Sequence, residues 1–415
     1  MRVVIINRSD SLGGAAVVMR RLMHALAREG AETSMLVLHR GTDDDAVTEL
    51  PSGNGQILRF VAERTRIFMH NGFSRQRLFK VDDGAFGRDL SRHPDVLAAD
   101  AIIIGWVNQA MISLADIERL TRLGKPVIQV MHDMWQCTAV CHHAGNCRQY
   151  TDRCTHCPLL DGHGKRLLTR AWERKRRLYE ATSLHFVAVS GWLADRCRES
   201  ALLAGRDIDV IANPLDVNAI GYEYHPLDGV PADKAVVTVA AARLDDTVKG
   251  FDTLIDLTHH IAAHEPDLAK RLHLLLVGNI KDSSLLCRLA LPYTAIGRAT
   301  AERTLDCYRA SRVVLSTARH ESFGATLAEG LAAGCVPVAT DSGGPRDIIR
   351  HRKNGFLAPP ATTRQEAQDA IPALAEGLKW ALAHDAPTRA ALHASVTPFD
   401  YPAIAKRYLD LCRKH

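Results

Sequence analysis

Short runs of apolar residues alternate with amphipathic stretches from one end of the chain to the other. The first run, residues 3–6, leads to two glycines and then to an amphipathic stretch at 15–28. Apolar runs of the same kind occur at 34–38, 101–104, 126–130, 185–189, 208–211, 236–239, 273–277, 312–315 and 336–339. Near-continuous apolar strands between helices are typical of parallel sheets with helices on both faces. The pattern therefore predicts an α/β protein with doubly wound sheets.

The strand and helix pattern occurs in two series, which predicts two Rossmann-like domains facing a central cleft. We place the first domain at residues 1–205 and the second at 206–398, because the strand pattern restarts at 208–211. Asn213-Pro214 is the expected crossing, since the residue before a proline disfavours the helical region. Residues 402–415 predict a last amphipathic helix with proline at its first position, which we expect to return to the first domain.

Composition narrows the class of protein. The chain has 415 residues, of which 47% are hydrophobic and 24% charged, enough for two or three packed domains. It has no apolar run of about 18 residues and no signal-peptide pattern at its start, so we expect a cytoplasmic protein without a membrane span. The formal net charge of +5 suits an anionic substrate or an anionic membrane surface. No DNA- or RNA-binding motif is found, so no nucleic-acid partner is expected.

The most informative segment is 320–346, which reads HESFGATLAEGLAAGCVPVATDSGGPR. Glu321 follows an expected strand at 312–316, and Glu329 lies eight positions later in an amphipathic stretch. In a helix this spacing is ~12 Å and keeps both glutamates near the same face. The alternative is that Glu321 caps the helix and that Glu329 is simply solvated.

The residues between the two glutamates form the expected first turn of that helix. Phe323, Gly324 and Ala325 offer main-chain N–H groups there, and Gly324 lets a ligand approach the backbone closely. The start of a helix is a ready phosphate site. Oxygens at both ends of an anion-binding helix suit a nucleotide-sugar, with the sugar near Glu321, the diphosphate over the amides and the ribose near Glu329.

A second charged segment follows the expected strand at 236–239. It includes the letters ARLDDTVKGF, in which Arg243 and Lys249 stand six positions apart around an acidic turn. A guanidinium in bidentate contact and an ammonium as a point charge suit a diphosphate. The alternative is an ordinary surface turn in which these cations pair with Asp245 and Asp246.

Together these segments resemble the C-terminal domain of retaining glycosyltransferases of the GT-B fold, and the large bacterial family 4 is the best match. The residues that carry the resemblance are ARLDDTVKGF, HESFGATLAEGLAAGCVPVATDSGGPRDII and NGFL. The resemblance implies a UDP- or GDP-sugar donor and no need for a catalytic metal. It also implies that Glu321 contacts sugar hydroxyls, that Glu329 contacts the ribose, and that Arg243 and Lys249 neutralise the leaving diphosphate together with the amides at 323–325.

The first domain agrees with this resemblance. Gly13 and Gly14 follow the first strand and open a helix, matching the family's glycine loop, which faces the diphosphate and the acceptor. His132 follows the strand at 127–131, where the family carries a histidine that approaches the donor sugar. The alternatives are an ordinary tight turn for the glycines, and a hydrogen-bonded core or cap residue for His132.

A narrower resemblance covers residues 91–160, which are similar to a branch that builds extracellular polysaccharides such as colanic acid. The chain departs from that branch in two places. Gly105 stands where the branch has histidine before Trp106, and Ala139 stands where it has glycine after Thr138. Both departures lie on the expected acceptor side, so they concern the identity of the acceptor more than the chemistry.

Four cysteines lie close together in the sequence: Cys141, Cys147, Cys154 and Cys157. The last two have the spacing of zinc ligands, and a cytosolic chain disfavours disulfides. Four thiolates would form a closed structural zinc site that holds a loop too polar to pack by itself. Two disulfides or free thiols are the alternatives.

Two basic stretches stand out. Residues 165–177 carry seven basic residues against one acid, and 64–80 is a second stretch of this kind. A basic amphipathic helix can lie on an anionic bilayer, which would suit a lipid-linked acceptor. The alternative is a solvated helix whose apolar face packs on the core.

The prediction is a retaining hexosyltransferase that moves a sugar from a nucleotide-diphospho-sugar to a saccharide hydroxyl on a lipid-linked precursor. His132, Arg243, Lys249 and Glu321 are the expected catalytic residues. The alternatives are a nucleotide-sugar epimerase or a sucrose-type synthase with the same donor site, and a non-catalytic scaffold for glycan assembly.

Overall fold

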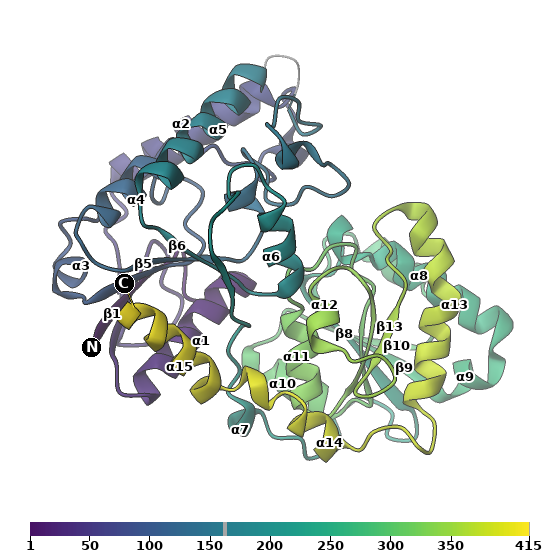
Figure 1. Ribbon diagram of the computed structural model, residues 1–415. Coiled ribbons are helices and arrows are strands. Elements are labelled where there is room, and N and C mark those ends of the chain that lie inside the picture. The colour runs from purple at the N-terminus through teal and green to yellow at the C-terminus, as the bar shows by residue number, and fades with distance from the viewer. Residues whose placement is uncertain (161–163, 415) are drawn as a thin grey trace. The chain divides into compact units, whose positions relative to one another are not determined.

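A computed structural model describes residues 1–160 and 164–414 (Figure 1). Residues 161–163 and 415, which fall within the predicted first domain, lie outside the described residues. The chain divides into two compact units. The first is Met1–Pro214 with Tyr401–His415, and the second is Leu215–Asp400.

The first unit is built on a seven-stranded parallel sheet, in the order β3-β2-β1-β4-β5-β6-β7. Its strands are β1 (Arg2–Ile6), β2 (Glu32–Val37), β3 (Val47–Glu49), β4 (Ala101–Ile104), β5 (Val127–Met131), β6 (His185–Ala188) and β7 (Ile208–Val210). The central strands are buried along almost their whole length, as their nearly continuous apolar sequences predict. Strand order reverses between β1 and β4, and in such sheets ligands bind at the carboxyl ends of the strands near this reversal.

Seven helices of the described residues belong to this unit. They are α1 (Gly14–Arg28), α2 (Asn54–His70), α3 (Pro94–Ala98), α4 (Leu114–Thr121), α5 (Lys165–Ala181), α6 (Gly191–Arg198) and α15 (Tyr401–Lys414). As predicted, the C-terminal helix α15 returns to this unit, where it packs on α1 (Figure 1). The Arg28 guanidinium lies over the Tyr401 ring, 4.9 Å from its centre. None of the helices in the described part of the chain is long and apolar enough to cross a bilayer.

The second unit is built on a six-stranded parallel sheet, in the order β10-β9-β8-β11-β12-β13. Its strands are β8 (Ala235–Arg243), β9 (Leu272–Asn279), β10 (Tyr293–Gly297), β11 (Val313–Ser316), β12 (Val336–Thr340) and β13 (Phe356–Ala358). Its helices are α7 (Val217–Ile220), α8 (Phe251–His264), α9 (Pro266–Arg271), α10 (Ala301–Arg309), α11 (Ala325–Ala332), α12 (Pro345–Ile348), α13 (Arg364–Ala381) and α14 (Arg389–Ala394). Strand order reverses between β8 and β11. The two predicted doubly wound, Rossmann-like domains are therefore confirmed.

The structure corrects the predicted start of the second domain at residue 206. Strand β7 belongs to the first sheet, where it pairs in parallel with β6 and sets Asp209 opposite Val187. The chain passes to the second unit only after Pro214, which has no main-chain N–H to continue a ladder. Leu215 then donates its N–H to Phe399 O at 2.8 Å, inside the second unit. A restart of the apolar pattern marked a last strand of the first sheet rather than a new sheet.

Candidate active site

Lys249 and Glu321 form an ion pair at the strand-order reversal of the second sheet. Lys249 ends the short 3-10 helix Thr247–Lys249 that follows β8, and Glu321 lies in the loop after β11. The distance from Lys249 Nζ to Glu321 Oε2 is 2.7 Å, and both side chains are partly exposed. The Glu321 carboxylate raises the pKa of Lys249, so the lysine is charged at neutral pH. Two residues predicted from separate motifs thus meet at one place.

Gly250 explains why the loops after β8 and β11 come so close. Its φ is 67°, and a Cβ at this position would lie 2.0 Å from Thr317 O. Thr317 donates its hydroxyl to Gly250 O at 2.9 Å, and Arg319 donates its N–H to Val248 O at 2.8 Å. Only glycine fits this crossing, since a side chain would be both strained and blocked. The contact between Lys249 and Glu321 is therefore built into the backbone.

A second backbone contact fixes the other side of the Glu321 loop. Glu321 donates its N–H to Ser342 O at 3.0 Å and accepts from the Gly344 N–H at 2.7 Å. A Cβ on Gly344 would lie 2.4 Å from Phe323 Cα. The glycine at position 344, after β12, therefore allows this turn to pack closely against the backbone of the loop that carries Glu321 and Phe323.

Helix α11 begins beside the ion pair and presents one half-exposed face. Its N-cap is Gly324, whose φ is 102°. Thr326 and Glu329 are half-buried and, three positions apart, lie on the same face. The Phe323 side chain is buried edge-to-face against Phe399 at 5.7 Å, so only its backbone is available to a ligand. Half-buried Ala325 occupies the first turn, where a helix has N–H groups without intrahelical partners.

A recess at the carboxyl ends of β8 and β11 joins these groups. Its polar lining includes Lys249, Glu321 and Thr326, together with Ser316 and Thr317. Its apolar lining comes from residues such as Ala240, Ala241 and Leu244. A cation, a carboxylate and a helix start around one recess suit a ligand that carries both phosphate and hydroxyl groups.

Arg243 lies at the end of β8 but does not join the ion pair. Its Nε donates to Asp245 Oδ1 at 2.9 Å, and 46% of its side chain is exposed. For Arg243 the structure thus has the surface pairing that was the alternative prediction. A diphosphate would have to compete with Asp245 for this guanidinium.

In the first unit, Gly13 and Gly14 lie at the start of α1, after β1. Gly13 has a φ of 94°, and a Cβ on Gly14 would meet nothing within 4 Å, so the backbone here is open to a ligand. The loop before them is fixed by Asp10, whose carboxylate accepts the N–H groups of Gly41 at 2.8 Å and Thr42 at 3.1 Å.

His132 directly follows β5, at the carboxyl edge of the first sheet. Within the described part of the chain, its Nε2 is buried and has no hydrogen-bond partner. Burial lowers the pKa of His132 to about 4, so the ring is neutral at pH 7. A buried ring nitrogen without a partner is uncommon and suits a nitrogen that meets a ligand.

Sequence reasoning missed the group around Asp133. This carboxylate accepts from Trp106 Nε1 at 3.0 Å, from His142 Nδ1 at 2.9 Å and from the Trp135 N–H at 2.8 Å. The rings of Trp106 and His142 lie 5.6 Å apart. Asp133 therefore fixes two rings next to His132. The sequence His132-Asp133-Met134-Trp135 could have indicated this group, because an aspartate directly after His132 can accept the N–H of Trp135.

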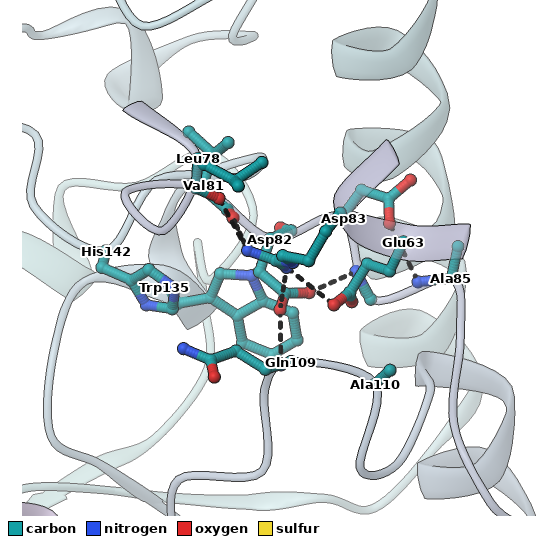
Figure 2. Close-up of polar contacts among 12 residues, drawn as sticks. Glu63, Leu78, Val81, Asp82, Asp83, Ala85, Gln109, Ala110, Trp135 and His142 are labelled. Carbon is teal, nitrogen blue, oxygen red and sulfur yellow. Dashed lines mark hydrogen bonds and ion pairs between the residues drawn. The ribbon is translucent and has the colours of Figure 1, made fainter. Parts of the chain in front are cut away.

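A buried ionic group includes Glu63 and Arg64 of α2, and no motif indicated it. Figure 2 shows Glu63, Asp82 and Asp83 of this group. Arg64 Nη2 donates to Glu63 Oε2 at 2.7 Å and to Asp82 Oδ2 at 3.3 Å. Asp83 pairs with Arg66 at 3.1 Å and with Arg174 of α5 at 3.4 Å. We call this group of residues 63, 64, 66, 82, 83 and 174 the α2 ion network. Burial raises the pKa of Glu63 to about 9, so it is protonated at neutral pH.

The carboxylates of this network are also the only candidate metal group among the described residues. Oxygens of Glu63, Asp82 and Asp83 lie within 4.8 Å of one another. Guanidinium groups contact all three side chains, although Glu63 Oε1 and Arg64 Nε are buried without a hydrogen-bond partner among the described residues.

The four cysteines of the predicted zinc site, Cys141, Cys147, Cys154 and Cys157, are free thiols in the structure. Burial, and after it the neighbouring Cys147 and Cys157, raise the pKa of Cys154 to about 11, so these thiols lie near one another. Cys141 also pairs with Val81 in an antiparallel bridge, and the Cys147 N–H bonds to Ala144 O. A zinc ion held by these four cysteines stays a prediction.

Comparison with known proteins identifies two family domains. Residues 12–219 match the family described as Glycosyltransferase Family 4, and residues 228–386 match Glycosyl transferases group 1. The chain is 31% identical over 235 residues to a phosphatidyl-myo-inositol mannosyltransferase of Mycobacterium tuberculosis, which covers 54% of this chain and 57% of that protein. The chain therefore matches little more than half the length of this relative.

Two solved structures share the fold over the whole chain. A sucrose-phosphate synthase from Thermosynechococcus elongatus has a TM-score of 0.63 at 16% identity, covering 100% of this chain and 98% of that one. HepE of Anabaena, solved in complex with UDP-glucose, has a TM-score of 0.59 at 16% identity, covering 100% of both chains. At these identities the likeness concerns the fold.

Proposed function

Because the chain belongs to the GT-B glycosyltransferases, with a family 4 domain followed by a group 1 domain, we propose that it is a retaining hexosyltransferase with a nucleotide-diphospho-sugar donor. The observation that carries the proposal is the ion pair of Lys249 and Glu321 beside the start of α11. It offers a cation to the diphosphate and a carboxylate to the sugar at one recess.

We assign the donor contacts as follows. Lys249, Arg243 and the main chain at 323–325 bind the diphosphate. Glu321 accepts hydrogen bonds from the sugar hydroxyls, and Glu329 accepts from the ribose. In the first unit, neutral His132 offers its Nε2 to a sugar hydroxyl. The nearby rings of Trp106 and His142, fixed by Asp133, are suited to an acceptor saccharide because sugars pack on flat rings.

The proposed chemistry is substitution on one face of the sugar. The bond from the anomeric carbon to the phosphate oxygen breaks, and the acceptor oxygen bonds to the same carbon on the same face. The acceptor proton passes to the departing phosphate oxygen. No nucleophilic carboxylate is needed at glycosidase spacing, and the main contribution of the protein is electrostatic stabilisation of the developing phosphate charge.

The donor and acceptor classes are part of the proposal. A nucleotide-sugar donor, UDP- or GDP-linked, is supported by the fold neighbour HepE, which was solved with UDP-glucose. A hexosyl group is supported by the relative whose name specifies mannosyl transfer. We propose a saccharide hydroxyl on a lipid-linked precursor of an extracellular polysaccharide as the acceptor, reached by the enzyme at the inner face of the membrane. An epimerase, a sucrose-type synthase and a scaffold remain the competing functions.

The test is a donor panel incubated with the protein and a lipid extract, followed by mass spectrometry of the products. Transfer should release UDP or GDP and add one hexose to a lipid-linked saccharide. Arg243→Ala should lower kcat by about 100-fold without altering thermal unfolding. Isomerised donor without an acceptor would show an epimerase. A full-rate Arg243→Ala enzyme, or no turnover of any donor, would contradict the proposal.

A further inference from the structure

Helix α2 has its apolar face outside and its charged face inside. Ile57, Leu58, Val61 and Met69 are between 50% and 68% exposed. Positions 57, 61 and 69 are four and eight residues apart, and Leu58 is adjacent, so these side chains share one face. The opposite face buries Gln56, Glu63 and Arg64 together with Ile67. An ordinary surface helix buries mainly apolar side chains, so the orientation of α2 is largely reversed.

The α2 ion network explains why the reversed orientation is stable. Glu63 and Arg64 point inward because Asp82 and the carbonyl oxygens of Leu78 and Val81 accept hydrogen bonds from the Arg64 guanidinium. Figure 2 shows Glu63, Leu78, Val81 and Asp82 close together. Turning the helix over would break these buried contacts and leave charges without partners, which is costly. The apolar face therefore stays in contact with the surroundings.

The exposed apolar surface continues beyond the helix. Phe73 and Phe79 are 66% and 52% exposed. Phe73 packs edge-to-face on Phe68 at 5.4 Å, and Phe79 stacks on Phe60 at 6.5 Å. Of eleven exposed large apolar side chains among the described residues, six lie at 57–79. Such a concentration on one surface indicates an interaction site rather than scattered exposure.

Cations surround this surface. Residues 64–81 contain five basic residues and no acid. Of these, Arg75, Arg77 and Lys80 are exposed. The start of α5 adds exposed Lys165 and Arg166. The start of α5 lies beside the end of α2 (Figure 1). Gly164, just before α5, comes so close to His70 at the end of α2 that a Cβ on it would lie 3.0 Å from the His70 carbonyl oxygen.

We propose that the outer face of α2, with Phe73, Phe79 and this basic rim, inserts into the headgroup region of an anionic bilayer. An apolar face bordered by cations complements a layer of acyl chains beneath anionic headgroups. A second copy of the same surface would bring cations against cations, which disfavours a symmetric dimer. The inference rests on the proposed function, since it supplies the membrane on which a lipid-linked acceptor is presented.

The α2 ion network also connects the outer face of α2 to the loops at the carboxyl edge of the sheet in the first unit. Asp82 accepts the Gln109 N–H at 2.7 Å and, through its main-chain oxygen, Trp135 Nε1 at 2.8 Å (Figure 2). Gln56 of α2 donates to Ala110 O at 2.8 Å. These contacts reach the loops after β4 and β5, which carry Trp106 and His132. A bilayer that holds α2 therefore also positions the loops that carry the proposed acceptor ring Trp106 and the proposed sugar contact His132.

Vesicle sedimentation tests the inference, with phosphatidylcholine vesicles compared with vesicles that also contain phosphatidylglycerol. Wild type should bind the anionic vesicles and lose binding at high salt. The triple variant Arg75→Gln/Arg77→Gln/Lys80→Gln should bind about 100-fold more weakly, because each cation near an anionic surface contributes about fivefold. The variant Leu58→Ser/Val61→Ser/Met69→Ser should lose at least about tenfold. Leu97→Ser removes an equally exposed apolar side chain, 54%, from α3 and should bind as wild type.

Parallel measurements separate this inference from the proposed function. Calorimetric titration with UDP and GDP should give unchanged affinity in all three variants, because none alters the second unit. Wild type that fails to bind anionic vesicles, or an apolar variant that binds as well as wild type, would overturn the membrane inference alone. So would light scattering that shows a wild-type dimer lost in the apolar variant, because the face would then bind a second copy. Absence of nucleotide binding would instead contradict the proposed function.

Discussion

Replacing Lys249 by methionine removes the charge of the donor-side ion pair and keeps most of the side-chain length. The ammonium lies 2.7 Å from Glu321 Oε2 and is 35% exposed, so it is neither fully buried nor fully screened. The substitution leaves Glu321 without its cation at the recess. Both effects disfavour an anion: one attractive charge is lost, and one repulsive charge is no longer neutralised.

The expected size follows from Coulomb's law. A cation about 4 Å from a phosphate charge contributes about 4 kcal/mol at an effective dielectric constant of about 20. Water in the half-open recess lowers this value, and we expect a net loss of about 2.8 kcal/mol, or about 100-fold in Kd for UDP or GDP. Lys249→Arg should recover most of this loss, since it keeps the charge at a similar length.

Lys234→Met provides the matched control. Lys234 precedes β8 at its amino end, whereas Lys249 follows it at its carboxyl end, and both side chains are 35% exposed. Calorimetric titration should therefore show normal nucleotide affinity for Lys234→Met. Equal affinity of Lys249→Met and wild type would refute the assignment, as would an equal loss in Lys234→Met, which would show a general charge effect.

Three further predictions concern the residues that hold the site and its support. Gly250→Ala should lower the free energy of unfolding by more than about 2 kcal/mol, because its Cβ would clash with Thr317 O. Gly229 also has a positive φ but has open space around it, so the control Gly229→Ala should cost only about 1 kcal/mol. Equal losses in chemical denaturation would contradict the clash. The Glu63 carboxyl has a folded pKa of about 9, above its unfolded value, so the folded state holds an extra proton between about pH 4.5 and 9. The free energy of unfolding should therefore fall as pH rises through this range. Glu63→Gln should flatten this slope in urea titrations, and an unchanged slope would show that Glu63 is ionised in the folded protein. His132 has a folded pKa of about 4, so the unfolded chain binds the proton first as pH drops from about 6.5 to 4. The free energy of unfolding should fall by up to about 3 kcal/mol over this range, and His132→Gln should remove the loss. A wild-type protein with the same stability at both pH values would contradict the burial of His132.

Local sequence predicted the elements but not every sheet assignment. Nearly continuous apolar runs such as 3–6 and Val127–Met131 became central strands, because strands covered on both faces need mostly apolar side chains. Buried Gln129 interrupts the second run and donates to Gly105 O at 3.1 Å. The short strand Ile208–Val210 has Asp209 between two apolar residues, and nothing in its sequence specifies which sheet it joins. That choice depends on pairing with β6, a contact made through the backbone.

The site was predicted in part for a similar reason. Resemblance to a family brought Lys249 and Glu321 together although they are 72 positions apart. It did not indicate that Arg243 pairs with Asp245, because side-chain partners at an exposed turn are decided locally. The sequence also did not predict the reversed orientation of α2. The spacing of apolar and polar residues shows that a helix has two faces, but it does not show which face the protein buries. The orientation depends on Asp82, which is distant in sequence.

The central claim is retaining transfer from a nucleotide-sugar, and proton NMR of the reaction tests it most directly. The donor found by the panel is followed with its lipid-linked acceptor, and the anomeric coupling of the transferred hexose is compared with that of the donor. The account predicts loss of the donor signal and a product with the same anomeric configuration. A product of opposite configuration would contradict the front-face mechanism, and an unchanged donor in the presence of acceptor would contradict glycosyl transfer itself.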